Sequence, residues 1–88
     1  MMEGKFRVPD ELCVGNTFSG FRVESSENTE TCHVWVFSRG NNAVVLSLPY
    51  DEYFTLLSNP SEGERIMDAL AAEVHRSFRE KESKIYGF

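Results

Sequence analysis

The chain has 88 residues, of which 41% are apolar and 12% aromatic, so the span 1–88 has the size and composition of one small domain with a single core. Its net charge of −5, from 14 acidic and 9 basic residues, disfavours binding to nucleic-acid phosphates or anionic membranes and favours a basic partner. Two cysteines are too few for a disulfide scaffold, and no apolar run resembles a membrane span or a signal peptide, which indicates a reduced, cytoplasmic protein.

The first part of the chain predicts an edge strand, a turn and one half-buried strand. Residues 5–9 (KFRVP) end in a proline, which cannot donate to a strand ladder and is common at strand ends. Residues 10–16 show no clear period and form a turn or a brief helical piece. In residues 18–25, Phe21 and Val23 alternate with charged side chains, which predicts a strand with one buried face.

Two apolar strands follow a polar segment. Residues 25–30 (SSENTE) are polar and turn-forming, which predicts a loop. Residues 31–37 (TCHVWVF) and 42–48 (NAVVLSL) are joined by 38–42 (SRGNN), whose glycine and asparagines readily accept a positive φ. We therefore expect the two strands to pair as an antiparallel hairpin.

Both faces of this hairpin are apolar. One face of the first strand would carry Cys32, Val34 and Val36, and the other His33, Trp35 and Phe37. In the second strand, Ala43, Val45 and Ser47 would oppose Val44, Leu46 and Leu48. A sheet with one wet face alternates apolar with polar residues, so this pattern predicts a central position in a small curved sheet, or burial in a dimer. One long helix covers only one face, which leaves the other for the short helix or a partner.

A short helix is predicted in LPYDEYFTLLSNP. Pro49 suits the first helical position, Asp51 and Glu52 suit the helix dipole, and the pair Asn59 and Pro60 ends the helix. The expected apolar face consists of Tyr50, Tyr53, Phe54 and Leu57.

A long amphipathic helix is predicted over about residues 62–82. Ser61 lies three residues before Glu64, which is the spacing of a capping box. Arg76 with Glu80, and Glu80 with Lys84, have the spacing of helical ion pairs. The apolar stripe is Ile66, Met67, Leu70, Ala71, Val74 and Phe78.

Together these elements predict an α+β fold. We expect a small antiparallel β-meander of three to four strands, followed by a short helix and a long C-terminal amphipathic helix packed on the sheet.

Residue types that make chemical sites are present, but their spacing is poor. Cys13, Cys32, His33 and His75 offer zinc-ligand atoms without a paired spacing, and Cys32 and His33 would face opposite sides of a strand. Cys32, His75 and Glu73 supply the residue types of a nucleophilic triad, yet no local pattern supports one. The glycines lack a phosphate-loop motif. We therefore predict no catalytic residue, no metal and no cofactor.

The surplus apolar surface predicts a non-catalytic protein-binding module. Such a module would be a regulator or inhibitor of a larger macromolecular complex, of the kind that phages and bacterial accessory genomes encode. The expected partner-binding residues are His33, Trp35 and Phe37 on the hairpin, with Tyr86 and Phe88 from the apolar tail KIYGF. The expected partner is a protein with a basic surface, or a second copy of the chain in a homodimer, and neither a membrane nor nucleic acid.

Two alternatives stay open at the level of sequence. The first is a small homodimeric enzyme or ligand-binding protein whose pocket is lined by Cys32, His33 or His75. The second is a weak nucleic-acid mimic whose carboxylates occupy a basic groove, which requires those carboxylates to gather on one surface.

Overall fold

The computed structural model describes residues 8–85, and the side chains of residues 8–81. The predicted strand residues 5–7, the side chain of Lys84, and the predicted partner-binding residues Tyr86 and Phe88 therefore lie outside the described part. The elements are η1 (Asp10–Leu12), β1 (Thr17–Phe18), β2 (Phe21–Asn28), β3 (Cys32–Arg39), β4 (Asn42–Pro49), α1 (Tyr50–Ser58) and α2 (Pro60–Ile85).

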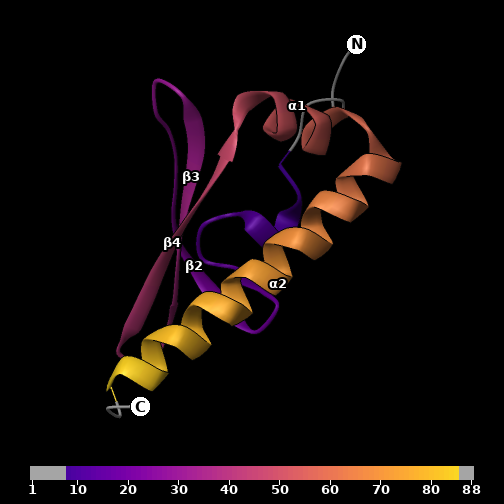
Figure 1. The fold of residues 1–88 in the computed structure, drawn as a ribbon. Helices are drawn as coiled ribbons and strands as arrows, with labels where there is room; N and C mark the ends of the chain where they lie inside the picture. The colour runs from indigo at the N-terminus through magenta and orange to yellow at the C-terminus, as the bar shows by residue number, and fades with distance from the viewer. Residues whose placement is uncertain (1–7, 86–88) are drawn as a thin grey trace.

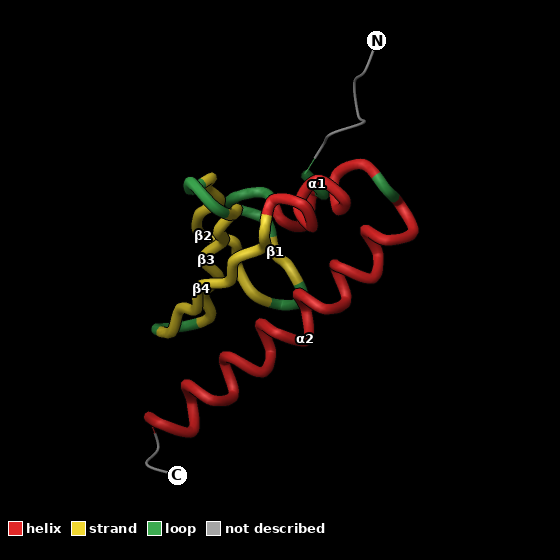
Figure 2. Tube along the Cα trace, turned by 45° about the horizontal axis from the view of Figure 1, so that its top comes forward, coloured by secondary structure: helices red, strands yellow, loops and turns green. Residues whose placement is uncertain are grey.

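The four strands form one antiparallel meander in the order β1-β2-β3-β4. The sheet curls into a half-barrel, and both helices lie on one side of it, with β4 the strand nearest α2 (Figures 1 and 2). The predicted α+β fold is confirmed, because a four-strand meander is followed by a short helix and a long helix that packs on the sheet.

A tight turn splits the single strand predicted over residues 18–25. Ser19 and Gly20 have φ angles of 54° and 90°, and they connect Phe18 of β1 to Phe21 of β2. Two positive φ angles in a two-residue connection are the pattern of a type I′ turn, whose twist matches that of paired strands. The prediction was wrong here because the apolar alternation on either side of the turn reads as one strand.

Gly40 makes the second tight turn, and here the prediction was right. Its φ of 63° starts the two-residue connection between Arg39 and Asn42, and β3 pairs with β4 from this turn to the Cys32–Pro49 pair. A positive φ at the first position alone fits a type II′ turn, where glycine has no steric cost. The predicted antiparallel hairpin is confirmed.

The segment 25–30, predicted as a loop, belongs largely to β2, which continues to Asn28. The register shifts between Val23 and Ser25, where one extra residue forms a β-bulge. Beyond the bulge, polar side chains remain in the strand because Ser26 and Asn28 bond to a histidine on β3. These hydrogen bonds between β2 and β3 produce no alternation of apolar residues in the sequence, so the strand could not be predicted there.

The first helix begins one residue later than expected, and its buried face differs from the expected one at Phe54 and Leu56. Pro49 is the last residue of β4, and α1 begins at Tyr50. Tyr53 and Leu56 are buried, whereas Phe54 is 53% exposed. Tyr50 and Leu57 are partly buried against the core, so the expected apolar face is confirmed except at Phe54. Leu56 was not expected to be buried, and it is buried because α1 packs on α2 as well as on the sheet.

The second helix is longer than the predicted 62–82, since it runs from Pro60 to Ile85. Its N-terminus is capped by Asn59, whose Oδ1 accepts from the backbone N–H of Glu62 at 3.1 Å. Ser61 therefore lies inside the first turn, and the capping box predicted there is wrong. The stripe is confirmed, with Leu70, Val74 and Phe78 buried and Ile66, Met67 and Ala71 partly buried.

One hydrophobic core lies between the sheet and the helices. Its fully enclosed side chains are Leu12, Phe21, Val23, Trp35, Phe37, Val74 and Phe78. Ring contacts join the layers, because Phe21 of β2 stacks on Phe78 of α2 with centroids 4.4 Å apart. Among the helices of the described chain, none has the length and hydropathy needed to cross a bilayer.

Candidate functional site

The inner face of the sheet carries three of the predicted partner-binding residues. Trp35 and Phe37 have no exposed area, and His33 is 5% exposed. Trp35 lies edge-on to Tyr53 of α1, and the helices cover all three side chains. These residues are part of the core, so we do not place a contact surface on them. The two helices thus cover the aromatic face of the hairpin.

His33 is held at both ring nitrogens. Its Nε2 lies 2.7 Å from Ser26 Oγ, and its Nδ1 lies 2.6 Å from Asn28 Oδ1. An amide oxygen accepts only, so Nδ1 carries the proton and Nε2 accepts from the Ser26 hydroxyl. Tyr53 stacks on the imidazole with centroids 4.3 Å apart. Burial lowers the pKa of His33, because desolvation disfavours the charged ring.

This cluster has the residue types of a serine nucleophile with its base. A buried imidazole needs partners for both nitrogens, and Ser26 and Asn28 supply them. Sequence reasoning missed Ser26 and Asn28, and only the β2–β3 register reveals them. The cluster fixes a neutral His33 in the core.

The second histidine joins the β1–β2 turn to α2. His75 Nε2 lies 2.8 Å from Ser19 Oγ, and its ring lies edge-on to Phe21 at 4.8 Å. Ser19 could not be selected from the sequence, because its partner is 56 residues away. The contact fastens the turn to the helix.

The cysteines are both free thiols and lie apart from the histidines. Cys13 Sγ donates to the carbonyl of Pro9 at 3.6 Å. Cys32 lies on the outer face of β3, where a hydrogen bond with the Thr29 hydroxyl lowers the pKa of the thiol. The three residues considered for a Cys/His-lined pocket, Cys32, His33 and His75, are not brought together, since Cys32 lies on the outer face of β3, His33 on its inner face, and His75 on α2 beside Ser19. Within residues 8–81, no cluster of three metal-ligand side chains occurs.

The outer face of the sheet has no element packed over it in the described chain. Four side chains, Cys32, Val34, Val36 and Val45, form a contiguous surface that we call the valine face. Val36 and Val45 are directly paired across β3 and β4, and Val45 is 63% exposed. Cys32, Val34 and Val36 are half-buried by their neighbours in the sheet.

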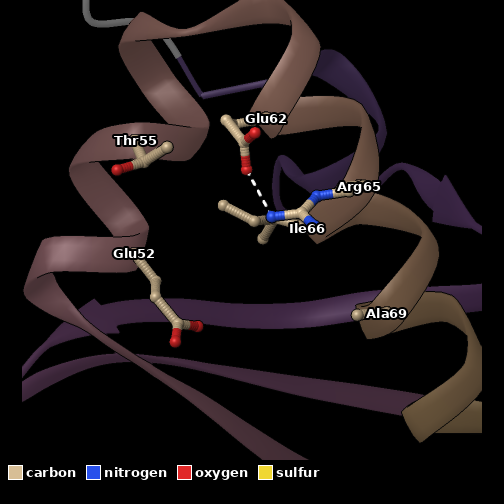
Figure 3. A pocket seen from close by; sticks show the side chains of 6 residues that line it. All are labelled: Glu52, Thr55, Glu62, Arg65, Ile66 and Ala69. Atoms are coloured by element: carbon tan, nitrogen blue, oxygen red, sulfur yellow. Dashed lines mark hydrogen bonds and ion pairs between the residues drawn. The ribbon is translucent and has the colours of Figure 1, made fainter.

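A shallow pocket of about 430 Å³ lies between the two helices (Figure 3). Glu52 extends from α1 into this space, and Arg65 of α2 turns toward Glu62, with which it forms an ion pair at 2.5 Å. The remaining lining residues are Thr55, Ile66 and Ala69. The charges of Glu62 and Arg65 offset each other, so the net charge of the lining comes from the Glu52 carboxylate.

The carboxylates are spread over several elements of the described chain. Glu24 pairs with Arg22 on β2 at 3.4 Å, and Glu73 and Glu80 pair with Arg76 on α2. The predicted Arg76–Glu80 ion pair is confirmed at 2.7 Å. The grouping that a nucleic-acid mimic requires is not seen in these residues.

No protein-family model, curated protein or solved structure matches this chain.

Proposed function

We propose that this protein is a non-catalytic protein-binding module that regulates or inhibits a larger assembly in the cytoplasm. Its partner docks on the valine face. The observation that carries the proposal is the contrast between the two faces of one sheet: helices cover the aromatic face, and the valine face stays open with Val45 63% exposed.

The chemistry of the valine face fits binding better than catalysis. Its centre is apolar, and β4 carries no charged residue, so desolvation of this surface costs little. Cys32 is the one titratable side chain on the valine face, and neither histidine shares that face to act as its base: His33 is enclosed in the core, and His75 is bonded to Ser19. A small apolar patch with a polar rim is typical of a protein interface.

A site-specific crosslinker tests this proposal. A photoreactive benzoylphenylalanine at Val45 should capture a discrete partner in the cells that encode the protein. The same group at Glu64, which is exposed on α2, is the matched control and should capture nothing specific. Adding Val36→Asp to the protein that carries benzoylphenylalanine at position 45 should abolish the adduct, while the circular dichroism spectrum stays unchanged.

The mass of the adduct separates the outcomes. An adduct with a different protein supports the proposal, and an adduct of twice the chain's mass supports the homodimer that the two-sided hairpin predicts. Equal capture from Val45 and Glu64, or an adduct that survives Val36→Asp, would contradict docking on the valine face.

A further inference from the structure

One hydrogen bond at the end of β2 shows which of its backbone groups face β3 and which face the opposite side, the edge of the sheet. In antiparallel strands, successive residues direct their backbone groups alternately to one neighbour and to the other. The N–H of Thr29 donates to the carbonyl of Cys32 at 2.8 Å, so Thr29 points toward β3. Asn28 and Ser26 therefore direct their N–H and C=O groups to the opposite side, away from β3.

The chain fills the first half of this edge. Phe21 pairs with Phe18 of β1. Val23 also points outward: its N–H donates to Asn16 at 2.9 Å, and its carbonyl accepts from Gly15 at 2.9 Å. The pairing of residues 15–18 with β2 ends at Val23. Beyond the bulge, no hydrogen bond from residues 8–85 reaches the outward backbone groups of Ser26 or Asn28.

The other edge of the sheet is protected. On β4, the carbonyl of Ala43 accepts from Lys81 Nζ at 2.8 Å, and α2 lies beside this strand (Figure 1). Proteins usually protect an edge with a helix, a lysine or a proline, and β4 has α2, Lys81 and its terminal Pro49. Within residues 8–85, no helix, lysine or proline covers the distal half of β2, so it is the edge that an added strand would meet.

The side chains around this open edge are acidic on the outer face. Glu27 is exposed on the outer face of β2, and Glu30 is exposed in the turn that follows. No ion pair joins either carboxylate to another described residue. A residue of an added strand opposite Glu27 would lie about 5 Å from it, the distance at which opposite charges on paired strands attract.

We propose that the β2 edge at Ser26–Asn28 binds an extended segment of a partner protein by strand addition, and that this segment places a lysine or arginine opposite Glu27. The inference rests on the proposed function, because it names the chemistry of the partner. Two residues of the segment would exchange backbone hydrogen bonds with Ser26 and Asn28, and the net charge of −5 would draw a basic segment to the edge.

A blocked five-residue peptide, Lys-Val-Lys-Val-Lys, is the probe. Aligned antiparallel, its valines lie opposite Ser26 and Asn28, and its central lysine lies opposite Glu27. Titration into the ¹⁵N-labelled full-length protein should shift the amide resonances of residues 25–28 in a saturable way. The Ser26 and Asn28 amides should then exchange more slowly with solvent.

Two controls separate strand addition from charge attraction. Methylation of both valine nitrogens removes the donors to β2 and should abolish saturable binding. Glu27→Lys should weaken binding about fivefold, whereas Glu64→Lys, the same charge change on α2, should change it less than twofold.

Three results would overturn the inference. They are Ser26 and Asn28 amides already protected in the free protein, peptide shifts centred on the helix pocket, and binding that survives nitrogen methylation. The crosslink from Val45 does not depend on this edge. A failed peptide titration with a successful Val45 crosslink would reject strand addition alone, and failure of both would reject the proposed function as well.

Discussion

At the scale of single residues, His33 shows how a polar side chain is accommodated in the core. It is the one buried polar side chain among the described residues, and it is stacked on Tyr53. Ser26 and Asn28 satisfy its two nitrogens, so its burial costs far less than that of an unpaired group. The indole Nε1 of Trp35 is also buried, and it has no hydrogen-bond partner among the described residues.

The pH dependence of stability follows from His33. Burial lowers its pKa in the folded protein, whereas the unfolded chain titrates near 6.5. As the pH falls through about 6.5, the unfolded state therefore binds a proton that the folded state does not, and the free energy of unfolding decreases. Urea unfolding at pH 8 and pH 5 should show this loss.

Two variants identify the histidine responsible. His33→Phe should reduce the difference between the two pH values, because the variant no longer has the enclosed imidazole. His75→Phe removes the other histidine and should retain the difference. The same pH dependence in wild type and His33→Phe would show that other groups cause it.

At the scale of elements, the junction between α1 and α2 depends on Asn59. Its N–H donates to the Thr55 carbonyl at 2.9 Å, which ends α1, and its Oδ1 caps α2. A Cβ on Gly63 would lie 3.1 Å from the Leu56 carbonyl oxygen, so glycine allows the two helices to approach closely there. One residue thus ends one helix and starts the next.

Stability measurements on this junction test which residue is the cap. Asn59→Ala should cost about 1 kcal/mol of unfolding free energy, because the N–H of Glu62 loses its partner. Ser61→Ala should change it by less than about 0.5 kcal/mol, since Ser61 is exposed inside the first turn. A larger loss from Ser61→Ala than from Asn59→Ala in urea unfolding would restore the capping box.

At the scale of the whole molecule, the two faces of the sheet differ in burial: the inner face forms the core, and the outer face has no helix over it in the described chain. Trp35 on the inner face has no exposed area, and Val45 on the outer face is 63% exposed. The curled sheet encloses its large aromatic side chains under two helices, while the smaller valines lie outside. We therefore expect substitutions on the outer face to change the stability of the fold much less than substitutions on the inner face.

Alanine substitutions, one on each face, test this contrast in stability. Trp35→Ala should cost about 3 to 5 kcal/mol of unfolding free energy, because it leaves a large cavity in the core. Val45→Ala should cost less than about 1 kcal/mol, since most of its surface is already in water. Similar losses from both substitutions would mean that the outer face is covered as well.

Most of the fold could be predicted because its signals are local. The period of α2 and the glycine of the β3–β4 turn act over a few residues, and both predictions are confirmed. The β1–β2 turn and the second half of β2 were not predicted. Ser19 and Gly20 form a dipeptide that is common in turns, but the alternation of Phe21 and Val23 outweighed it in the prediction. The strand character of Ser26 depends on a histidine seven residues away.

The sequence by itself determined that the β3–β4 hairpin has two apolar faces, since alternation along a strand assigns each side chain to one face or the other. Only the tertiary structure decided which face is inside. That choice depends on how volumes fit across the sheet and helices, where Trp35 and Phe37 fill the space beneath Tyr53, Val74 and Phe78. Those contacts join residues far apart in the chain, and for that reason the aromatic residues expected to bind a partner form the core and the valines form the surface.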